Sequence, residues 1–293
     1  MAEAIAVCVA TFRRPGQLRT LLDALQSQST DLPWHVYVID NDPERSAEEV
    51  VRAHPLSVTY RAEPTPGIVA ARNAGLDIAA EPLLAFIDDD EYPDAGWLEA
   101  LSACMTRYSA DAVWGPVVSV FPEDTPRWVH DGGFFSRSRN ATGAEFDQAA
   151  TNNLLVRRAA IDALELPRFD ERFSASGGSD SELFHRAWKN GSRIIWCDEA
   201  IVYEDVPHER MTVAWLKKRA RRTGNVRGRL LVQDGRRARA WIEGTGRVAV
   251  GACRLVLDRV GGRPLRSRSL NTWMRGWGVL DAARDRVVIE YRR

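Results

Sequence analysis

Residues 83–94 read LLAFIDDDEYPD, an apolar run that ends in four consecutive acids. The run is apolar on both faces, so it predicts a strand in the middle of a sheet. Neighbouring carboxylates repel one another, and water or a cation has to screen them. Because side chains alternate along a strand, Asp88 and Asp90 would point to one side and could share a hard divalent cation. The alternative is an acidic turn that only ends the strand.

Strands and helices alternate on both sides of this run. Apolar runs predict strands at 5–10, 34–40, 58–61, 83–88 and 192–198, and helical spacing predicts helices at 67–80, 95–108 and 179–191. This alternation is typical of an α/β fold with a mostly parallel sheet that helices cover. In such sheets ligands bind at the carboxyl ends of the strands.

The composition is that of a globular protein. The chain has 293 residues, of which 45% are hydrophobic and 27% are charged, so a disordered or fibrous class is excluded. Its four cysteines form no CxxC pair, which argues against a disulfide framework or a structural zinc site and favours the cytoplasm. We also expect no signal peptide and no membrane-spanning helix, because the first residues and the apolar runs lack the required patterns.

The net charge of zero conceals two oppositely charged segments. From Pro207 onward there are 22 Lys and Arg against 7 Asp and Glu, a net charge of +15. Residues 1–206 hold the remaining 18 basic and 33 acidic residues, a net charge of −15. Such asymmetry suggests an acidic catalytic body with a basic arm for anionic partners; the alternative is that the two parts pack together.

Two further strand ends carry polar residues. The first strand runs into Thr11, Phe12 and Arg13, and the second ends at Asp40. Arg13 could pair with a phosphate, and Asp40 could accept a hydrogen bond from a base edge or a ribose hydroxyl. Taken singly, each residue fits a solvated loop position better than a ligand contact.

In their order, the segments VATFRRP, VIDND, GIVAARNAG and FIDDDEYPD resemble glycosyltransferase family 2, the inverting enzymes of GT-A fold. The resemblance implies a Rossmann-like, mostly parallel central sheet flanked by helices. It implies a catalytic domain at 1–208, divided into a nucleotide-sugar-binding half at 1–110 and an acceptor-binding half at 111–208. Residues 209–293 would form a basic, mainly helical C-terminal extension.

The resemblance also implies a set of donor contacts and a metal. The donor would be a nucleotide-diphosphate sugar, with UDP favoured, and the residues implied to hold it are Thr11, Arg13, Asp40, Gly67, Arg72, Asn73, Asp88 and Asp89. Asp90 is the implied ligand of Mn²⁺ or Mg²⁺. His208 falls where many GT-A enzymes place a further ligand, and an imidazole suits manganese better than magnesium. The alternatives are a helix start for Gly67, a surface cation for Arg72 and a surface or core imidazole for His208.

The segment Gly177-Gly178-Ser179-Asp180 stands where family members carry a Gly-Gly-Glu-Asp-like motif before a helix. The resemblance implies that Asp180 is the general base that takes the proton of the acceptor hydroxyl. Without the resemblance, Asp180 would be only an acid at a helix start, where the helix dipole favours its ionised form. Ser179 departs from the usual Glu, which leaves the acceptor contacts in doubt. Trp128 and Asn153 resemble acceptor-side positions loosely, alongside Gly178 and Ser179.

The expected function is an inverting transfer of a sugar to a hydroxyl acceptor. A glycan, a lipid-linked sugar or a small molecule would serve as acceptor, in the synthesis of a bacterial-type polysaccharide, glycolipid or glycoconjugate. One alternative is a sugar-1-phosphate nucleotidyltransferase, although its Gly-rich loop would here be ATFRRPGQL, with one glycine. The other is a non-catalytic nucleotide- or glycan-binding protein, which the Ser179 departure would fit.

The C-terminal arm carries basic clusters at 217–222, 227–229 and 236–239, followed by amphipathic segments at 248–260 and 272–280. Such segments can lie on an anionic membrane surface, here the inner face of the membrane. The alternative is a helical subdomain that packs on the acidic body. No nucleic-acid-binding motif accompanies the charge, so nucleic acid is not an expected partner.

Overall fold

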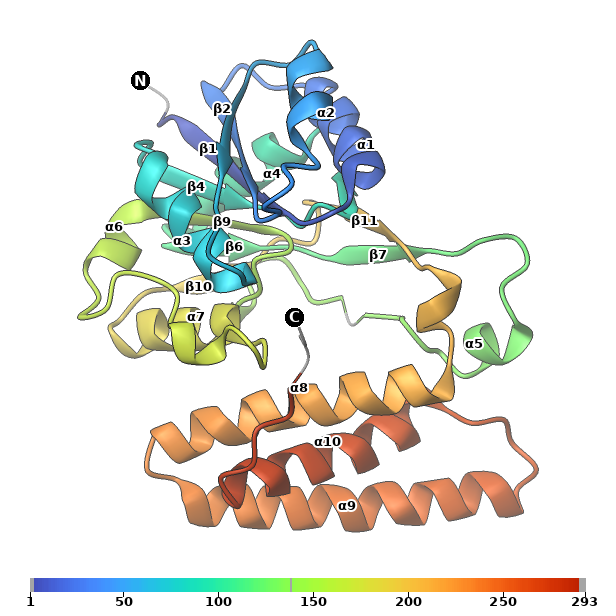
Figure 1. The fold of residues 1–293 in the computed structure, drawn as a ribbon. Coiled ribbons are helices and arrows are strands. Elements are labelled where there is room, and N and C mark those ends of the chain that lie inside the picture. Colours follow the sequence, from blue (N-terminus) through green and yellow to red (C-terminus); the bar gives the residue numbers. More distant parts are fainter. Residues whose placement is uncertain (1–2, 138, 290–293) are drawn as a thin grey trace. The chain divides into compact units, whose positions relative to one another are not determined.

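The computed structural model describes residues 3–137 and 139–289, which divide into two compact units (Figure 1). The sheet unit lies within residues 1–118, 137–174 and 179–204, and the helical unit within 119–136, 175–178 and 205–293. The helical unit thus includes three segments that lie before the expected boundary at 208, namely 119–136, 175–178 and 205–208. The division of the first unit into a donor half and an acceptor half stays a prediction.

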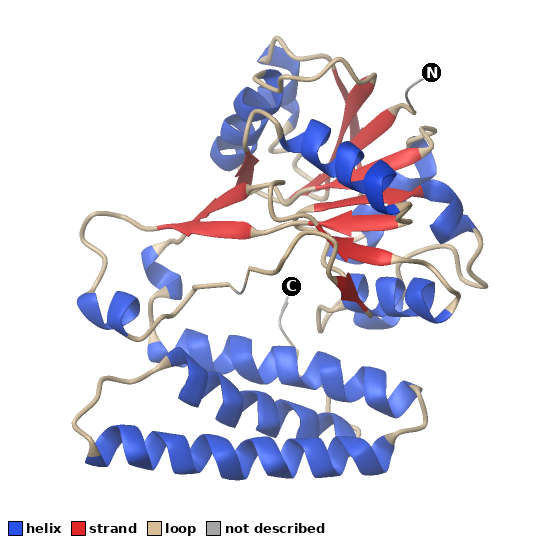
Figure 2. Ribbon diagram, turned by 180° about the vertical axis from the view of Figure 1, so that it is seen from behind, coloured by secondary structure: helices blue, strands red, loops and turns tan. Residues whose placement is uncertain are grey.

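An eight-stranded sheet forms the centre of the sheet unit (Figure 2). In spatial order its strands are β3 (Val58–Ala62), β2 (Trp34–Asp40), β1 (Ile5–Thr11), β4 (Leu83–Phe86), β9 (Leu154–Arg157), β6 (Ala112–Trp114), β10 (Ile194–Trp196) and β8 (Glu145–Phe146). The four strands from β3 to β4 are parallel to one another, whereas β9 is antiparallel to β4 and β6. A smaller sheet pairs β5 (Glu91–Pro93), β11 (Val202–Asp205) and β7 (Val117–Val120). The expected α/β class with a mostly parallel sheet is confirmed.

Helices cover both faces of the large sheet. Along β1, Val7 and Val9 belong to one apolar core and Ala6 and Cys8 to the other, as the two-residue period of a strand requires. The first core includes residues of α1 (Pro15–Gln26), α2 (Glu48–Ala53) and α4 (Trp97–Tyr108). The second includes residues of α3 (Ile68–Ile78), α6 (Arg158–Asp162) and α7 (Ser179–Lys189), with the 3-10 turn η1 (Glu171–Phe173) preceding α7.

The helical unit is built differently. Its elements are α5 (Arg127–Asp131), the 3-10 turn η2 (His208–Arg210), α8 (Val213–Gln233), α9 (Arg237–Val260) and α10 (Ser267–Ala283). Glycines bring the helix backbones together: a Cβ added to Gly224 would collide with the backbone of Arg275, and one added to Gly251 with that of Trp273. The larger apolar core of this unit lies near α5 and the start of α8, around Phe134. The long helices therefore pack largely through close contact between their backbones.

Candidate active site

The acidic run begins directly after β4 at the carboxyl edge of the sheet. Asp89 is buried; its carboxylate accepts a hydrogen bond from Thr11 Oγ1 at 2.8 Å and another from Arg14 Nη1 at 2.8 Å. The same Arg14 nitrogen lies 3.0 Å from Asp90 Oδ2. Two strand ends far apart in sequence thus meet here, because β1 and β4 pair in parallel.

Arg72 of α3 connects the acidic run to the start of α7. Its Nη2 lies 3.4 Å from Asp88 Oδ1, and its Nη1 lies 3.4 Å from Ser179 Oγ. Asp180, the next residue, is close enough to Asp88 for its charge to act on that carboxyl. Residues from α3, the end of β4 and the start of α7 therefore converge on one place within the sheet unit.

The electrostatics of this place disfavour further negative charge. Partial burial raises the pKa of Asp88 to about 6, against the attraction of Arg72, and the charges of Asp90, Asp89 and Asp180 add to the rise. The Asp88 side chain keeps 41% of its surface exposed, so water screens part of this effect. Burial also raises the pKa of Asp89, although Arg14 opposes it. A cation at this edge would relieve the repulsion.

Glu91, the last acid of the run, faces a second buried acid. Glu91 on β5 faces Glu204 on β11 across an antiparallel pair, and both side chains are buried. Burial, followed by the charge of Asp88, raises the pKa of Glu91 well above its ordinary value. Arg137 pairs with Glu204, and Asn152 Nδ2 donates to Glu91 at 3.2 Å. The Glu91 carboxylate also accepts a hydrogen bond from the Asp88 backbone nitrogen at 3.3 Å, which links the two ends of the acidic run.

The Asp40 carboxylate holds the loop after β2. It is completely buried and accepts hydrogen bonds from the backbone nitrogens of Asp42 at 3.0 Å and of Ala47 at 2.9 Å, and from the Tyr60 hydroxyl at 3.0 Å. Its expected contact with a nucleotide stays a prediction. Arg13, by contrast, is 56% exposed and lies 3.2 Å from Asp42.

The loop before α3 is held by Asn41, which sequence reasoning had passed over. Asn41 Oδ1 accepts from the Gly67 backbone at 2.8 Å, and its Nδ2 donates to the carbonyls of Glu63 and Thr65. Gly67 has a φ of 128°, which a side chain would strain, and an added Cβ would collide with Ser174. The expected Gly67 is therefore required by the backbone at the entrance to α3.

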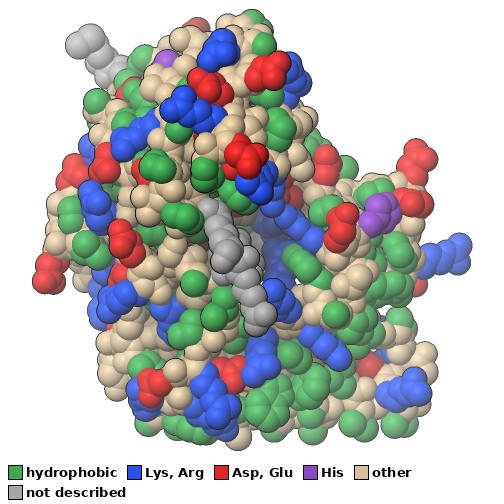
Figure 3. Space-filling model, viewed as in Figure 1, with side chains coloured by type: hydrophobic (Ala, Val, Ile, Leu, Met, Phe, Trp, Pro, Cys, Tyr) green, Lys and Arg blue, Asp and Glu red, His purple; other side chains and the backbone are tan. Residues whose placement is uncertain are grey.

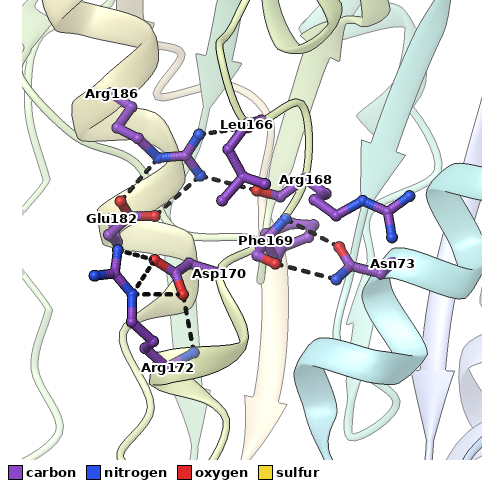
Figure 4. Close-up of polar contacts among 8 residues, drawn as sticks. All are labelled: Asn73, Leu166, Arg168, Phe169, Asp170, Arg172, Glu182 and Arg186. Carbon is purple, nitrogen blue, oxygen red and sulfur yellow. Dashed lines mark hydrogen bonds and ion pairs between the residues drawn. The ribbon is translucent and has the colours of Figure 1, made fainter.

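The Asn73 side chain holds the backbone of Phe169 (Figure 4). It donates to the Phe169 carbonyl at 3.1 Å and accepts from the Phe169 backbone nitrogen at 2.9 Å. The figure also shows Arg186 of α7 paired with Glu182 and bound to the carbonyls of Leu166 and Arg168. These bonds fix the segment that leads to α7, and the expected donor contact of Asn73 stays a prediction.

Asn153 connects three segments of the sheet unit. It is fully buried; its Nδ2 donates to the carbonyls of Pro116 and Ala200, and its Oδ1 accepts from Trp97 Nε1 at 2.8 Å. Its expected acceptor role stays a prediction. Trp128 lies in α5 of the helical unit, with its ring edge-on to Phe134, and its acceptor role stays a prediction.

Comparison with known proteins decides the family. The family model described as glycosyl transferase family 2 matches residues 6–164, which is more than half of the chain. The chain belongs to glycosyltransferase family 2.

Relatives of this family 2 chain include named transferases. The succinoglycan biosynthesis protein ExoM of Rhizobium meliloti (strain 1021) is 36% identical over 243 residues, covering 81% of this chain and 78% of that protein. A validoxylamine A glucosyltransferase of Streptomyces hygroscopicus subsp. jinggangensis (strain 5008) is 29% identical over 242 residues, covering 70% of this chain and 56% of its own length.

Solved structures show the same GT-A fold. Residues 1–349 of S. aureus TarS, crystallised with UDP, match with a TM-score of 0.55 and 17% identity over 97% of this chain and 92% of that one. GalNAc-T7, crystallised with UDP, GalNAc and Mn²⁺, matches with a TM-score of 0.57 and 14% identity over 75% of this chain and 47% of that one. At these identities the likeness establishes the fold alone.

The metal ligands expected for this family 2 chain fall in different units. Asp90 belongs to the sheet unit, and His208 to the helical unit, where its Nε2 lies 3.2 Å from Asp124. Within residues 3–137 and 139–289, no group of three or more His, Cys, Asp and Glu side chains is arranged to hold a metal ion. The pairing of Asp90 with His208 on one metal stays a prediction.

Residues that the sequence reasoning missed are Arg14, Asn41 and Glu91. Arg14 stands beside Arg13 in the same RR pair, and no pattern tells which of the two turns toward the acids. The backbone of Arg13 is left-handed, with a φ of 56°, and no sequence pattern indicates this conformation either. Glu91 is the last acid of the run, and the sequence analysis assigned it no role.

Proposed function

We propose that this family 2 chain is an inverting glycosyltransferase that moves a sugar from a nucleotide-diphosphate donor, with UDP favoured, to a hydroxyl acceptor. Asp180 would be its general base. The proposed donor side of the site consists of Thr11, Arg13, Asp40, Gly67, Arg72, Asn73, Asp88 and Asp89. The proposed setting is the synthesis of a bacterial-type polysaccharide, glycolipid or glycoconjugate, in the cytoplasm and at the inner face of the membrane.

The observation that carries the proposal is the bridge formed by Arg72. This residue contacts both Asp88 and Ser179, so the candidate base at Asp180 lies beside the acidic run although 90 residues separate Asp180 from Asp90 in the sequence. A transferase needs this arrangement, because the base has to reach the acceptor hydroxyl while the donor is bound at the sheet edge.

The proposed reaction is a single displacement. The acceptor oxygen bonds to the anomeric carbon of the donor, its proton passes to the Asp180 carboxylate, and the bond from that carbon to the diphosphate oxygen breaks. Asp180 Oδ1 accepts from the backbone of Ser181 at 2.7 Å, which fixes the direction of the carboxylate. Positioning therefore contributes more than proton affinity, since a helix start favours the ionised acid.

A divalent cation at the acidic run is part of the proposal. Asp88, Asp89, Asp90 and Glu91 crowd one strand end, and their neighbours Arg14 and Arg72 compensate only part of the charge. Magnesium and manganese are held in such sites by one or two carboxylates together with substrate phosphates. Asp90 is the proposed ligand, and the ion would neutralise charge on the departing diphosphate.

The family assignment bears differently on the two alternative functions, a nucleotidyltransferase and a non-catalytic binding protein. Membership of glycosyltransferase family 2 displaces the sugar-1-phosphate nucleotidyltransferase. A non-catalytic binding protein is separated from the enzyme by turnover, because it would bind the donor without releasing nucleoside diphosphate.

The test is donor turnover with a panel of sugar nucleotides, with and without Mn²⁺ or Mg²⁺. We expect metal-dependent release of nucleoside diphosphate by the wild type and a loss of about 10²-fold or more for Asp180→Asn, the size of a general-base contribution. Asp90→Ala should also abolish turnover. The control is Asp77→Asn, which removes an acid half-exposed on α3 and should change little.

The stereochemistry and the base are tested separately. The anomeric configuration of the product, measured by NMR, should be inverted relative to the donor. Near-normal turnover by folded Asp180→Asn would refute the assignment of the base, and a retained configuration would refute the single displacement.

A further inference from the structure

The outer face of α9 is apolar along most of the helix. We call this face the α9 stripe; its members are Ile242, Gly246, Ala249, Val250, Cys253, Val256, Leu257 and Val260, all of them exposed. Ile242 keeps 75% of its surface exposed, Leu257 66% and Val260 81%. Their spacing of three and four residues places them on one side of the helix over a length of about 27 Å.

The inner face of α9 carries the small residues instead. Gly244 and Gly251 are buried, and a Cβ added to either would collide with α10. A helix that packs in water ordinarily turns its large aliphatic side chains inward and its small or polar ones outward. The reversed order in α9 means that the stripe contributes nothing to the packing of the helical unit, and an exposed apolar patch of this extent marks an interaction surface.

Basic side chains border the stripe. Arg247 and Arg254 lie along one flank by their helical positions, and Arg259 lies on the other. The acids of this stretch are engaged: Glu243 pairs with Arg247 and Arg227, and Asp258 is buried against Ser269. Figure 3 shows hydrophobic side chains gathered along the rim where α9 lies in Figure 1, with Lys and Arg among them.

This charge pattern distinguishes two occupants. If a second copy of the chain covered the stripe, the arginine flanks of the two helices would face each other, and like charges would oppose the contact. An anionic bilayer has the complementary charge, and a basic residue near such a surface contributes about 1 kcal/mol. In the described part of the chain, no helix is both long and apolar enough to cross a bilayer.

We propose that the α9 stripe docks in the headgroup region of an anionic bilayer, with α9 parallel to the surface. The aliphatic side chains enter the boundary of the acyl chains, and the flanking arginines stay at the phosphate level. Resting on the transfer proposed above, the inference also names a substrate class: the acceptor is carried on a lipid. The docking face is α9; in the Trp-bearing segment 272–280, Trp277 is exposed, and the buried residues are Gly276, Gly278, Val279 and Leu280.

The test is co-sedimentation of the full chain with vesicles, without donor or metal. One set contains phosphatidylglycerol and phosphatidylcholine, and the other contains phosphatidylcholine alone. We expect binding to the first set, at least 10-fold weaker binding to the second, and at least 10-fold weaker binding by the double variant Val256→Asp/Leu257→Asp. Because both residues are more than 60% exposed, the variant should fold, which circular dichroism checks. Leu166→Asp is the matched control, because Leu166 is a 40% exposed apolar residue of the sheet unit.

Two outcomes would overturn the proposal. One is equal vesicle binding by the wild type and the double variant. The other is a wild-type dimer that ignores vesicles and that the double variant converts to a monomer in sedimentation velocity, which would assign the stripe to a second copy. Turnover of the sugar nucleotide is measured separately in solution, so a failure of docking and a failure of the proposed chemistry give different results.

Discussion

Trp97 of α4 is completely buried in the sheet unit, whereas Trp241 of α9 keeps 37% of its surface exposed in the helical unit. The contrast extends to the other large apolar residues. In the sheet unit Leu, Ile, Val and Phe side chains fill two cores on either side of the strands. In the helical unit glycines bring α8, α9 and α10 together, while Ile242 and Val260 face outward.

The difference shows that the two units depend on different contributions to stability. Side-chain burial stabilises the sheet unit, so removing a side chain there leaves a cavity. Close approach of backbones stabilises the contacts among the long helices, so adding a side chain there forces them apart. The outer face of α9 is free of both constraints, which leaves it available for binding.

The largest effect is expected where a large side chain is removed from the sheet unit. Trp97→Ala should lower the free energy of unfolding by about 3–5 kcal/mol, because it opens a cavity and leaves Asn153 Oδ1 without its donor. Trp241→Ala should cost less than about 1 kcal/mol, mainly through its contact with Arg284. Urea unfolding followed by circular dichroism measures both; similar losses for the two variants would break the comparison.

A smaller effect is expected in α9, where a side chain is added and not removed. Gly251→Ala should lower the free energy of unfolding by about 1–3 kcal/mol, since the new methyl group meets the Trp273 backbone. Gly246→Ala, on the outer face of the same helix, should raise it by about 0.5–1 kcal/mol, because it meets nothing within 4 Å and Ala is the better helix former. Thermal unfolding of the pair gives the result. If Gly251→Ala were also stabilising, the helices would not be packed by close backbone approach.

The smallest effect concerns an ion pair of the sheet unit. The Arg139 guanidinium, 2.8 Å from Asp198, lowers the pKa of that carboxyl below its ordinary value of 3.8. A lowered folded-state pKa means that the pair stabilises the fold above about pH 4 and loses its effect as the pH falls through the folded-state pKa. Asp198→Asn should therefore cost at most about 1 kcal/mol at pH 7 and nothing near pH 2. Unfolding curves at several pH values check this; a difference that persists at low pH would show that the pair acts through packing.

Local sequence determined the first half of the fold well. The predicted strand at 34–40 is β2 to the residue, and the other strand ends fall within two residues, because continuous apolar runs are typical of buried parallel strands. The short α2 was not predicted, since six residues hold too few apolar positions to show a period. The boundary at 208 stays a prediction, and segments 119–136 and 175–178 join the helical unit through contacts that no local pattern records.

The candidate site also depends partly on local sequence and partly on tertiary structure. Sequence alone determined which residue types stand at the strand ends, and the segment order was enough to identify glycosyltransferase family 2. Which way each side chain turns depends on partners far along the chain. Tyr60 donates a hydrogen bond to Asp40, the Phe169 backbone donates one to Asn73, and Trp97 donates one to Asn153, and none of these partners follows from a local pattern. Only the tertiary structure brings Arg72 between Asp88 and Ser179, because such contacts arise from chain packing and not from neighbours in sequence.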